Sequence, residues 1–249
     1  MSVITAALFI FFLVTYFSAN EALNEGRFSD AKSFFVTIPF AKTLIPDKYA
    51  YADVGTHAEK GEVSEAVEAY NQLKQSTVPN PVLDELNKKM YEMGQIAYRH
   101  DKFGDAFSTF DALGEYERSL DYLTLIFARN GGVFESNKNS AIDLIGFEDA
   151  SDIVINNPFT AIEYLTGSWI DETNTYYFVV TKQDDSYWFS YNTPANATGH
   201  FYFNEGVFSI GTTEDTASEQ FKFIIQNPDK VLVICYADNS EHFLYRQDQ

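Results

Sequence analysis

The sequence is poor in the residues from which most catalytic and metal sites are built. Its 249 residues include a single cysteine, Cys235, so an intramolecular disulfide framework and a cysteine-based zinc site are excluded. The four histidines stand isolated in the chain, and none has the spacing of a metal-binding pair. Serine-nucleophile elbows, phosphate-binding glycine loops and dinucleotide-binding glycine motifs are also missing. We therefore expect a protein that is not an enzyme and that binds no cofactor or metal.

Basic residues are scarce as well, with 17 Lys and Arg against 36 Asp and Glu and a formal net charge of −19. They are scattered singly along the chain. Nucleic-acid binding depends on clustered Lys and Arg that neutralise phosphates, so we expect no nucleic-acid partner. The acidic surface keeps the protein soluble, or it attracts cationic partners or metal ions.

A few residues leave weak chemical alternatives open. The pairs Asp171-Glu172, Asp184-Asp185 and Glu214-Asp215 fall in predicted turns, where solvated side chains are the usual outcome and loose Ca²⁺ binding or paired-carboxylate chemistry is the alternative. Asn196-Ala197-Thr198 fits an N-glycosylation acceptor, which matters only in a eukaryotic secretory context. Cys235 lies within an apolar predicted strand, which favours a buried, inert thiol over a nucleophile.

Charge is absent from the first twenty residues, and 3–17 are almost continuously apolar. About twenty such residues in a helix span the hydrocarbon core of a bilayer. We therefore expect residues 1–20 to form a transmembrane anchor. A cleaved signal peptide fits less well, because no Lys or Arg precedes Arg27 and a cut after Ala19 would place the bulky Phe17 where a small residue is preferred. A helix buried in a soluble core is the third alternative.

The flanks of this segment favour an outward orientation. No basic residue stands on its N-terminal side, so the positive-inside rule has nothing to count there. The acidic residues Glu21, Glu25 and Asp30 follow it. We expect a single-pass membrane protein with the bulk of the chain outside the cytoplasm. The absence of basic residues before the apolar segment also leaves open that the natural N-terminus is longer.

A short signature occurs three times in the first half of the chain. A turn residue is followed by an apolar residue, an alanine and then an aromatic residue, all at helical spacing. The alanines, Ala31, Ala66 and Ala106, are 35 and then 40 residues apart. A small alanine lets a neighbouring helix approach, and the aromatic residue fills the space beyond it. The pattern predicts a helical repeat array with helices at 28–39, 46–61, 63–74, 81–100, 103–113 and 116–129. Asn80 and Pro81 are expected as the N-cap and first residue of the fourth of these helices.

Region 21–130 resembles tetratricopeptide repeats. The helix–turn–helix match in the third copy comes from Gly94, Phe103, Ala106 and Phe110. The second copy matches through Gly61, Val63, Ala66 and Tyr70, although Val54 stands where the family usually has Gly. The first copy matches only in its second helix. The 40-residue step exceeds the family's usual period of about 34. The segment 110–119 also looks like a divergent version found in membrane-anchored proteins of Gram-positive bacteria.

The resemblance implies protein or peptide binding on the concave surface formed by the first helix of each repeat. Lys48 and Tyr51 recur 40 residues later as Lys88 and Tyr91. Such a Lys and Tyr one turn apart could hold an acidic or C-terminal carboxylate group. The predicted binding residues are Lys48, Tyr51, Lys88, Tyr91, Gln95, Tyr98 and Arg99. The alternative is that the tyrosines pack internally and the lysines solvate a helix face.

From Gly167 onward the hydrophobic period changes to two, which predicts strands. Eight short strands in sequential hairpins are expected, and such a meander closes into a barrel or folds into a sandwich. They are expected at 167–170, 176–180, 186–191, 199–203, 207–210, 220–225, 231–236 and 242–245. The preceding connector, 131–164, contains the apolar patches 141–145 and 158–165, which we expect to form short helices that dock one domain on the other.

The opening Gly167-Ser168-Trp169 and the closing Leu244-Tyr245-Arg246 resemble the signature of lipocalin-like barrels. In that family the Trp plugs one end of the barrel, and the interior holds a small apolar ligand. A barrel confined to 165–249 is shorter than a full lipocalin, so its many Phe and Tyr residues could instead fill the interior.

These observations predict a multidomain α plus β protein. We expect a transmembrane helix (1–20), an α-solenoid of tetratricopeptide-like repeats (21–130), a connector (131–164) and an antiparallel eight-strand meander β-barrel (165–249). The expected function is that of a non-catalytic, membrane-anchored scaffold that holds a protein or peptide partner. The alternative is a carrier or sensor for a small apolar ligand.

Overall fold

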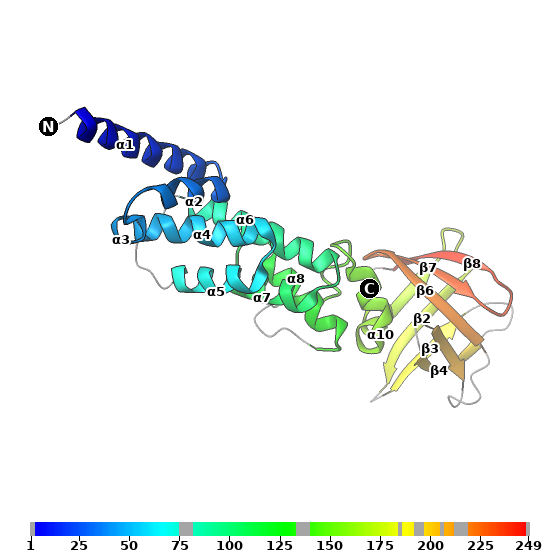
Figure 1. Cartoon of the computed structure of the whole chain (residues 1–249). Coiled ribbons are helices and arrows are strands. Elements are labelled where there is room, and N and C mark those ends of the chain that lie inside the picture. Colours follow the sequence, from blue (N-terminus) through cyan, green and yellow to red (C-terminus); the bar gives the residue numbers. More distant parts are fainter. Residues whose placement is uncertain are drawn as a thin grey trace. The chain divides into compact units, whose positions relative to one another are not determined.

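The computed structural model describes residues 3–74, 82–132, 140–183, 186–191, 197–204, 207–211 and 219–247. The chain forms two compact units, Met1–Leu123 and Thr124–Gln249. The first unit is helical, and the second contains a β-barrel together with short helices (Figure 1). The predicted connector and the predicted barrel therefore fall in the same unit.

The helical unit follows the predicted order closely. The helices predicted to begin at Phe28, Pro46, Val63 and Phe103 are confirmed. A short helix at 41–44 was not predicted, and the helix predicted from 116 begins at Ser119, after a left-handed Glu117 with φ 48°. Asn80 and Pro81 lie outside the described residues. The helices are α1 Val3–Asn24, α2 Phe28–Thr37, α3 Ala41–Leu44, α4 Pro46–Lys60, α5 Val63–Lys74, α6 Leu83–Arg99, α7 Phe103–Leu113 and α8 Ser119–Arg129.

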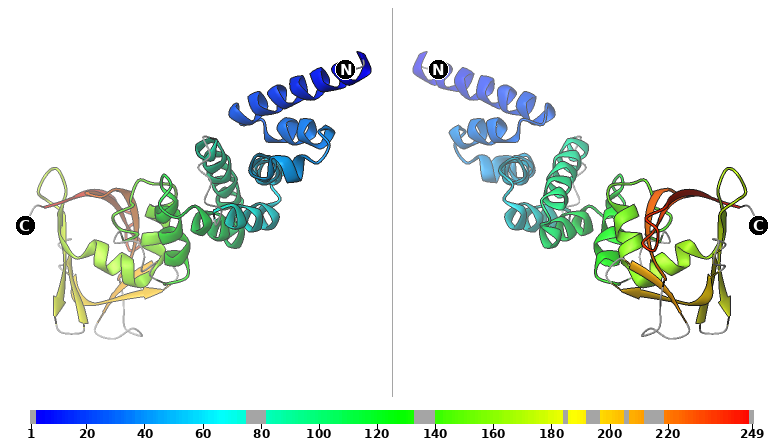
Figure 2. Two further views of the ribbon diagram at one scale, coloured as in Figure 1. Left: turned by 90° about the vertical axis from the view of Figure 1, so that its left-hand side faces the viewer. Right: turned by 90° about the vertical axis from the view of Figure 1, so that its right-hand side faces the viewer.

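Consecutive helices form antiparallel hairpins, α1 with α2, α4 with α5 and α6 with α7 (Figure 2). The turn after α4 depends on Gly61, whose φ of 69° is a left-handed conformation that glycine adopts without strain. All three signature alanines are fully buried, and each is followed by a buried aromatic ring: Phe35, Tyr70 and Phe110. The Tyr70 hydroxyl donates to Asn87 Oδ1 at 2.6 Å, and burial raises the pKa of this phenol to about 12.

Two glycines allow the closest approach between helices. A Cβ at Gly55 of α4 would lie 2.0 Å from Cγ of Phe28, so the Phe28 ring of α2 packs directly against the backbone at this glycine. A Cβ at Gly94 of α6 would lie 2.9 Å from the ring of Phe110 in α7. Aromatic rings of α2 and α7 thus pack directly onto the backbone of α4 and α6.

Helix α1 divides into a solvent-facing and a packed part. Its window Ala7–Asn24 is long and apolar enough to cross a membrane. Large apolar side chains are exposed along the first part and at Phe17, whereas Thr15, Ala19 and Leu23 are buried. The expectation of an apolar N-terminal helix of membrane-spanning length is confirmed, and its orientation stays a prediction. The exposed set is Leu8, Phe9, Ile10, Phe11, Leu13, Val14 and Phe17.

Two short helices precede the barrel in the second unit, α9 (Ala150–Asn156) and α10 (Pro158–Leu165). The helix predicted at 158–165 is confirmed, but 141–145 forms turns instead of the expected helix. Asp143 accepts a hydrogen bond from the backbone N–H of Ser140 at 2.8 Å, and Gly146 adopts a φ of 95°, so the segment closes into turns. The Tyr164 hydroxyl of α10 donates to the Asn227 carbonyl in the barrel at 3.1 Å.

The strands form an antiparallel meander that closes into a barrel, as predicted, in the order β1-β2-β3-β4-β5-β6-β7-β8. The closing contact between β1 and β8 is short and pairs Trp169 with Arg246 and Ile170 with Tyr245. The strands are β1 Gly167–Ile170, β2 Tyr177–Gln183, β3 Ser186–Tyr191, β4 Ala197–Asn204, β5 Val207–Gly211, β6 Glu219–Asn227, β7 Lys230–Cys235 and β8 Glu241–Arg246.

Aromatic rings fill the described part of the barrel interior. Phe178 stacks on Phe189 with centroids 5.5 Å apart, and Phe208 meets Phe223 edge-on at 5.0 Å. These rings are at most 2% exposed. Alternation along the strands directs them inward, as the period of two predicts.

Candidate functional site

The predicted binding residues of α4 are engaged in internal packing. Lys48 donates hydrogen bonds to the Tyr16 hydroxyl at 3.0 Å and to Asn20 Oδ1, and its ammonium lies 5.0 Å from the centroid of the Tyr16 ring. Its charge is therefore directed at α1. Tyr51 is only 3% exposed, so its ring contributes to the core of the helical unit.

Three predicted residues of α6 converge on Tyr122 of α8, a residue that sequence reasoning did not single out. The rings of Tyr91 and Tyr98 meet the Tyr122 ring edge-on at 6.0 and 5.0 Å, and Gln95 Nε2 donates to its hydroxyl at 3.1 Å. Tyr122 itself stacks flat on Phe110 at 4.3 Å. Burial raises the pKa of Tyr91, so its phenol stays neutral at physiological pH.

The other two predicted residues of α6 remain at the surface. Lys88 and Arg99 are exposed. At 3.6 residues per turn, Lys88, Glu92, Ile96 and Arg99 fall on one side of the helix. The structure thus brings Lys88 and Arg99 to one helix face, away from the position of Lys48 against α1. Their role in binding stays a prediction.

A groove of about 470 Å³ runs beside this face of α6. Ile96 is 59% exposed there, although Met93 and Ala97 next to it are buried. Lys89 and Glu92 form an ion pair of 2.9 Å at its edge. The groove is lined by residues from α4 to α7: Ala58, Glu59, Lys60, Gly61, Val63, Lys89, Glu92, Met93, Ile96, Ala97, His100, Lys102 and Asp105.

The sequence contains one sign of this groove. The buried stripe of α6 repeats at Leu86, Met90, Met93 and Ala97, and Ile96 is an apolar residue outside it. An isolated isoleucine off the core stripe is common on protein surfaces, so it is informative only once helices α4 and α7 are known to flank it.

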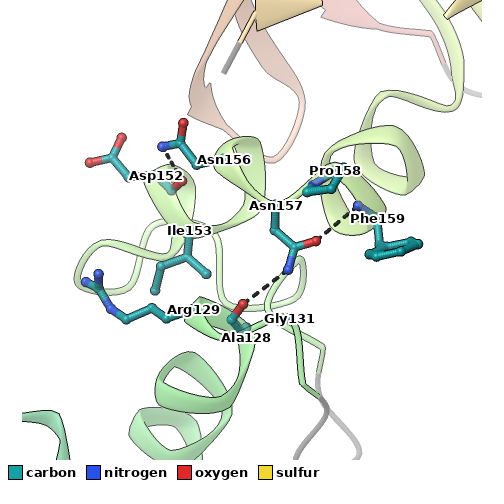
Figure 3. Close-up of a pocket in the computed structure, with 9 residues that line it drawn as sticks. All are labelled: Ala128, Arg129, Gly131, Asp152, Ile153, Asn156, Asn157, Pro158 and Phe159. Carbon is teal, nitrogen blue, oxygen red and sulfur yellow. Dashed lines mark hydrogen bonds between the residues drawn. The ribbon is translucent and has the colours of Figure 1, made fainter. Parts of the chain in front are cut away.

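The barrel unit carries a pocket of about 370 Å³ near the end of α8 (Figure 3). Its polar groups serve the fold. Asn157 Oδ1 accepts from the backbone N–H of Phe159 at 3.0 Å and caps α10, and Asn157 Nδ2 donates to the Ala128 carbonyl at 3.2 Å. Arg129 forms an ion pair with Asp149. The side chains of Asn157 and Arg129 are thus already bonded within the protein, which leaves few polar groups among the labelled residues to bind a ligand.

The lipocalin-like signature residues meet at the closing contact of the barrel. Trp169 is fully buried, and its Nε1 donates to the Leu165 carbonyl at 3.0 Å. The Arg246 guanidinium lies 4.3 Å from the Trp169 ring centroid. Arg246 also donates to the carbonyls of Tyr164 at 2.6 Å and Thr166 at 3.2 Å. This arrangement fixes α10, β1 and β8 together.

The weak chemical alternatives gain little support from the described residues. Among them, no group of three or more His, Cys, Asp or Glu residues could hold a metal ion. Cys235 is 5% exposed, and burial raises the pKa of its thiol, which disfavours the nucleophilic thiolate. Asp171 Oδ1 accepts from the backbone N–H groups of Thr175 at 2.7 Å and Tyr176 at 3.0 Å, so it shapes a turn. The other two acidic pairs and Asn196 lie outside the described residues.

Comparisons of the chain with protein-family models, with curated proteins and with solved structures find no significant match.

Proposed function

We propose that the protein is a non-catalytic scaffold that α1 holds at a membrane and that binds a protein or peptide partner through its helical unit. In this proposal the hairpins are tetratricopeptide-like repeats stacked as a solenoid. The buried alanines Ala31, Ala66 and Ala106 support it, because each lies in the second helix of a hairpin and permits close stacking.

The observation that carries the binding role is the groove beside α6. An isoleucine that is 59% exposed lies among charged side chains that line the groove, where an apolar anchor of a partner could cover it. Such a combination of an apolar centre and a polar rim is typical of protein interfaces.

The charges beside the groove indicate the chemistry of the partner. Lys88 and Arg99 lie on the same side of α6 as Ile96, and both are exposed. Cations at this spacing favour a carboxylate, and Arg can bind it through two parallel hydrogen bonds. We therefore propose a partner segment with an apolar side chain next to an acidic or C-terminal carboxylate group.

Site-specific photocrosslinking tests this proposal. A photoreactive residue at Ile96, in the full chain in its native cells, is expected to trap a discrete partner. Lys88→Glu combined with Arg99→Glu should reduce that product at least about tenfold, because each lost charge-assisted contact contributes about 1.5 kcal/mol or more.

The matched control places the same photoreactive residue at Ser108, an exposed position of α7 outside the groove. It should give no discrete product. Binding in this groove would be ruled out if Ile96 and Ser108 gave equal yields of crosslinked product. It would also be ruled out if the yield at Ile96 did not change with both charge reversals.

The runner-up role, carriage of a small apolar ligand in the barrel, has less support. The described interior is occupied by stacked rings such as Phe178, Phe189 and Phe223. A ligand would have to displace packed aromatic side chains, which costs the contacts that they make with one another.

For the location, we propose that the bulk of the chain faces outward from the cytoplasm. Support comes from the acidic flank of α1, Glu21, Glu25 and Asp30, since basic residues are the ones retained on the cytoplasmic side.

A further inference from the structure

The stretch from the end of α2 to the start of α4 is unusually apolar for this chain. Residues 33–46 contain no acidic side chain and a single basic one, Lys42, in a protein with a net charge of −19. Within it, Val36 is 64% exposed, Phe40 is 80% exposed and Leu44 is 69% exposed. A water-facing loop would normally place polar side chains at such positions.

The backbone at Phe40 is strained. Its φ of 62° and ψ of 22° are left-handed, a conformation that a bulky aromatic residue rarely adopts. Strain of this kind costs about 1 kcal/mol or more. It persists where the surrounding structure enforces it, and it is concentrated at functional positions. Burial against the protein does not compensate for it, because the ring projects outward. An apolar environment outside the protein would compensate for it.

Contacts between α4 and α1 fix where this stretch lies along α1. Lys48, in the first turn of α4, bonds to Tyr16 and Asn20. Helix α3 ends at Leu44, immediately before α4. Figure 1 shows α3 at the end of α4 that lies toward the N-terminal half of α1. The start of α4 therefore lies level with Tyr16 and Asn20, where the exposed apolar surface of α1 ends at Phe17, and α3 lies on the apolar, N-terminal side of that level.

This level is the one at which a membrane-spanning α1 would leave the hydrocarbon core. Aromatic and basic side chains concentrate at that depth in membrane proteins. Here the Lys42 ammonium lies 5.0 Å from the centroid of the Tyr49 ring, and the Lys48 ammonium lies over Tyr16. Long basic side chains above an apolar surface reach the lipid phosphates while their stems stay in the acyl region.

We propose that residues 33–46 form an interfacial foot that inserts Phe40 and Leu44 into the boundary between headgroups and acyl chains. Phe40 and Leu44 are one helical turn apart, and the Leu44 N–H donates to the Phe40 carbonyl at 2.9 Å, so both side chains can enter the same layer. Lys42 contacts anionic headgroups beside them. The inference rests on the proposed insertion of α1 in the same bilayer.

A second contact of this kind changes what the anchor does. A single helix leaves the attached domain free to swivel, whereas a helix and a foot at two points fix its orientation to the membrane plane. The helical unit would then present the α6 groove in a constant direction.

Spin labels on single cysteines test the foot. The full chain carrying Cys235→Ala is reconstituted in vesicles of phosphatidylcholine and phosphatidylglycerol, with a label at Phe40→Cys or, separately, at Leu44→Cys. Accessibility to a water-soluble nickel chelate is expected to be several-fold lower at both positions than at Phe159→Cys, and accessibility to oxygen higher. Phe159 is the matched control, because it is also a phenylalanine that is 80% exposed.

A third label, at Leu13→Cys, reports on α1 alone. If Leu13 is lipid-exposed while Phe40 and Leu44 are as accessible to the chelate as Phe159, the foot is refuted and the anchor stands. If Leu13 is also in water, the proposed anchoring fails, and the foot fails with it. Spin–spin broadening at Phe40 with exclusion of both oxygen and chelate would instead show a contact between copies, which also refutes the foot.

Discussion

Gly55→Ala is expected to destabilise the helical unit by about 3 kcal/mol, the upper end of the usual range for overpacking. The added Cβ would lie 2.0 Å from Cγ of Phe28 and 2.4 Å from both of its Cδ atoms. Relief requires the ring to leave its place between α2 and α4, because Phe28 is fully buried there. Urea unfolding of the full chain in detergent, followed by the circular dichroism of its helices, measures the effect.

Gly104→Ala in α7 is the matched control, since nothing lies within 4 Å of its new Cβ. It should be neutral or slightly stabilising, by about 0.5 kcal/mol, because alanine favours helix. Adding Phe28→Ala to Gly55→Ala should cost less than the sum of the two single changes, by about 1 kcal/mol or more. Additive effects, or equal effects of the two glycine substitutions, would contradict the close packing of Phe28 on Gly55.

Trp169→Ala is expected to destabilise the barrel by about 3–5 kcal/mol. The indole is fully buried, with the Tyr164 ring centroid at 5.4 Å, the Phe178 ring at 5.7 Å and the Arg246 guanidinium at 4.3 Å. Its removal leaves a cavity where α10, β1 and β8 join. The remaining tryptophan, Trp188 of β3, reports the unfolding by fluorescence.

Trp188→Ala is the control for this experiment. Trp188 is 38% exposed, so its truncation should cost about 1 kcal/mol or less. Trp169 then serves as the reporter. The chain has two tryptophans, and each variant keeps one of them inside the barrel unit. Equal losses in the two variants would show that Trp169 does not hold the closing contact together.

Much of the helical unit can be read from the sequence, because its signature encodes packing. The alanine marks the point of close approach, and turn glycines such as Gly61 mark the ends of helices. Helix α3 escapes this reading, since four residues are too short to show a periodicity, and its left-handed Phe40 violates the preference for glycine at such positions. The strained position is also the one that the interfacial foot would explain.

The predicted binding residues illustrate a different limit. Spacing on one helix identifies which side chains share a face, but not which neighbouring helix covers it. Tyr91 and Tyr98 share a face of α6, and Tyr122 of α8, two helices further along the chain, contacts both of them. The periodicity of α6 gives no information about this contact. The same reasoning separates Lys48, which contacts α1, from Lys88, which is exposed.

The barrel was predictable in kind because apolar and polar residues alternate in strands such as β6, where Phe221 and Phe223 are buried and Lys222 between them is exposed. The prediction of a helix at 141–145 was wrong for a local reason. Apolar content there suggested a helix, but side-chain to backbone hydrogen bonding by Asp143 favours turns.

The order of the strands also has a consequence for the time course of folding. Each pairing except that of β8 with β1 joins strands that follow one another in the chain. These hairpins close only short loops, so their formation has a small entropic cost. The β1–β8 pairing instead brings Trp169 to Arg246 across nearly the whole domain. We infer that this closure comes last, after the rate-limiting barrier. Weakening this pairing by a substitution at Arg246 would then leave the folding rate nearly unchanged and raise the unfolding rate. The β1–β8 pairing therefore determines the lifetime of the folded barrel.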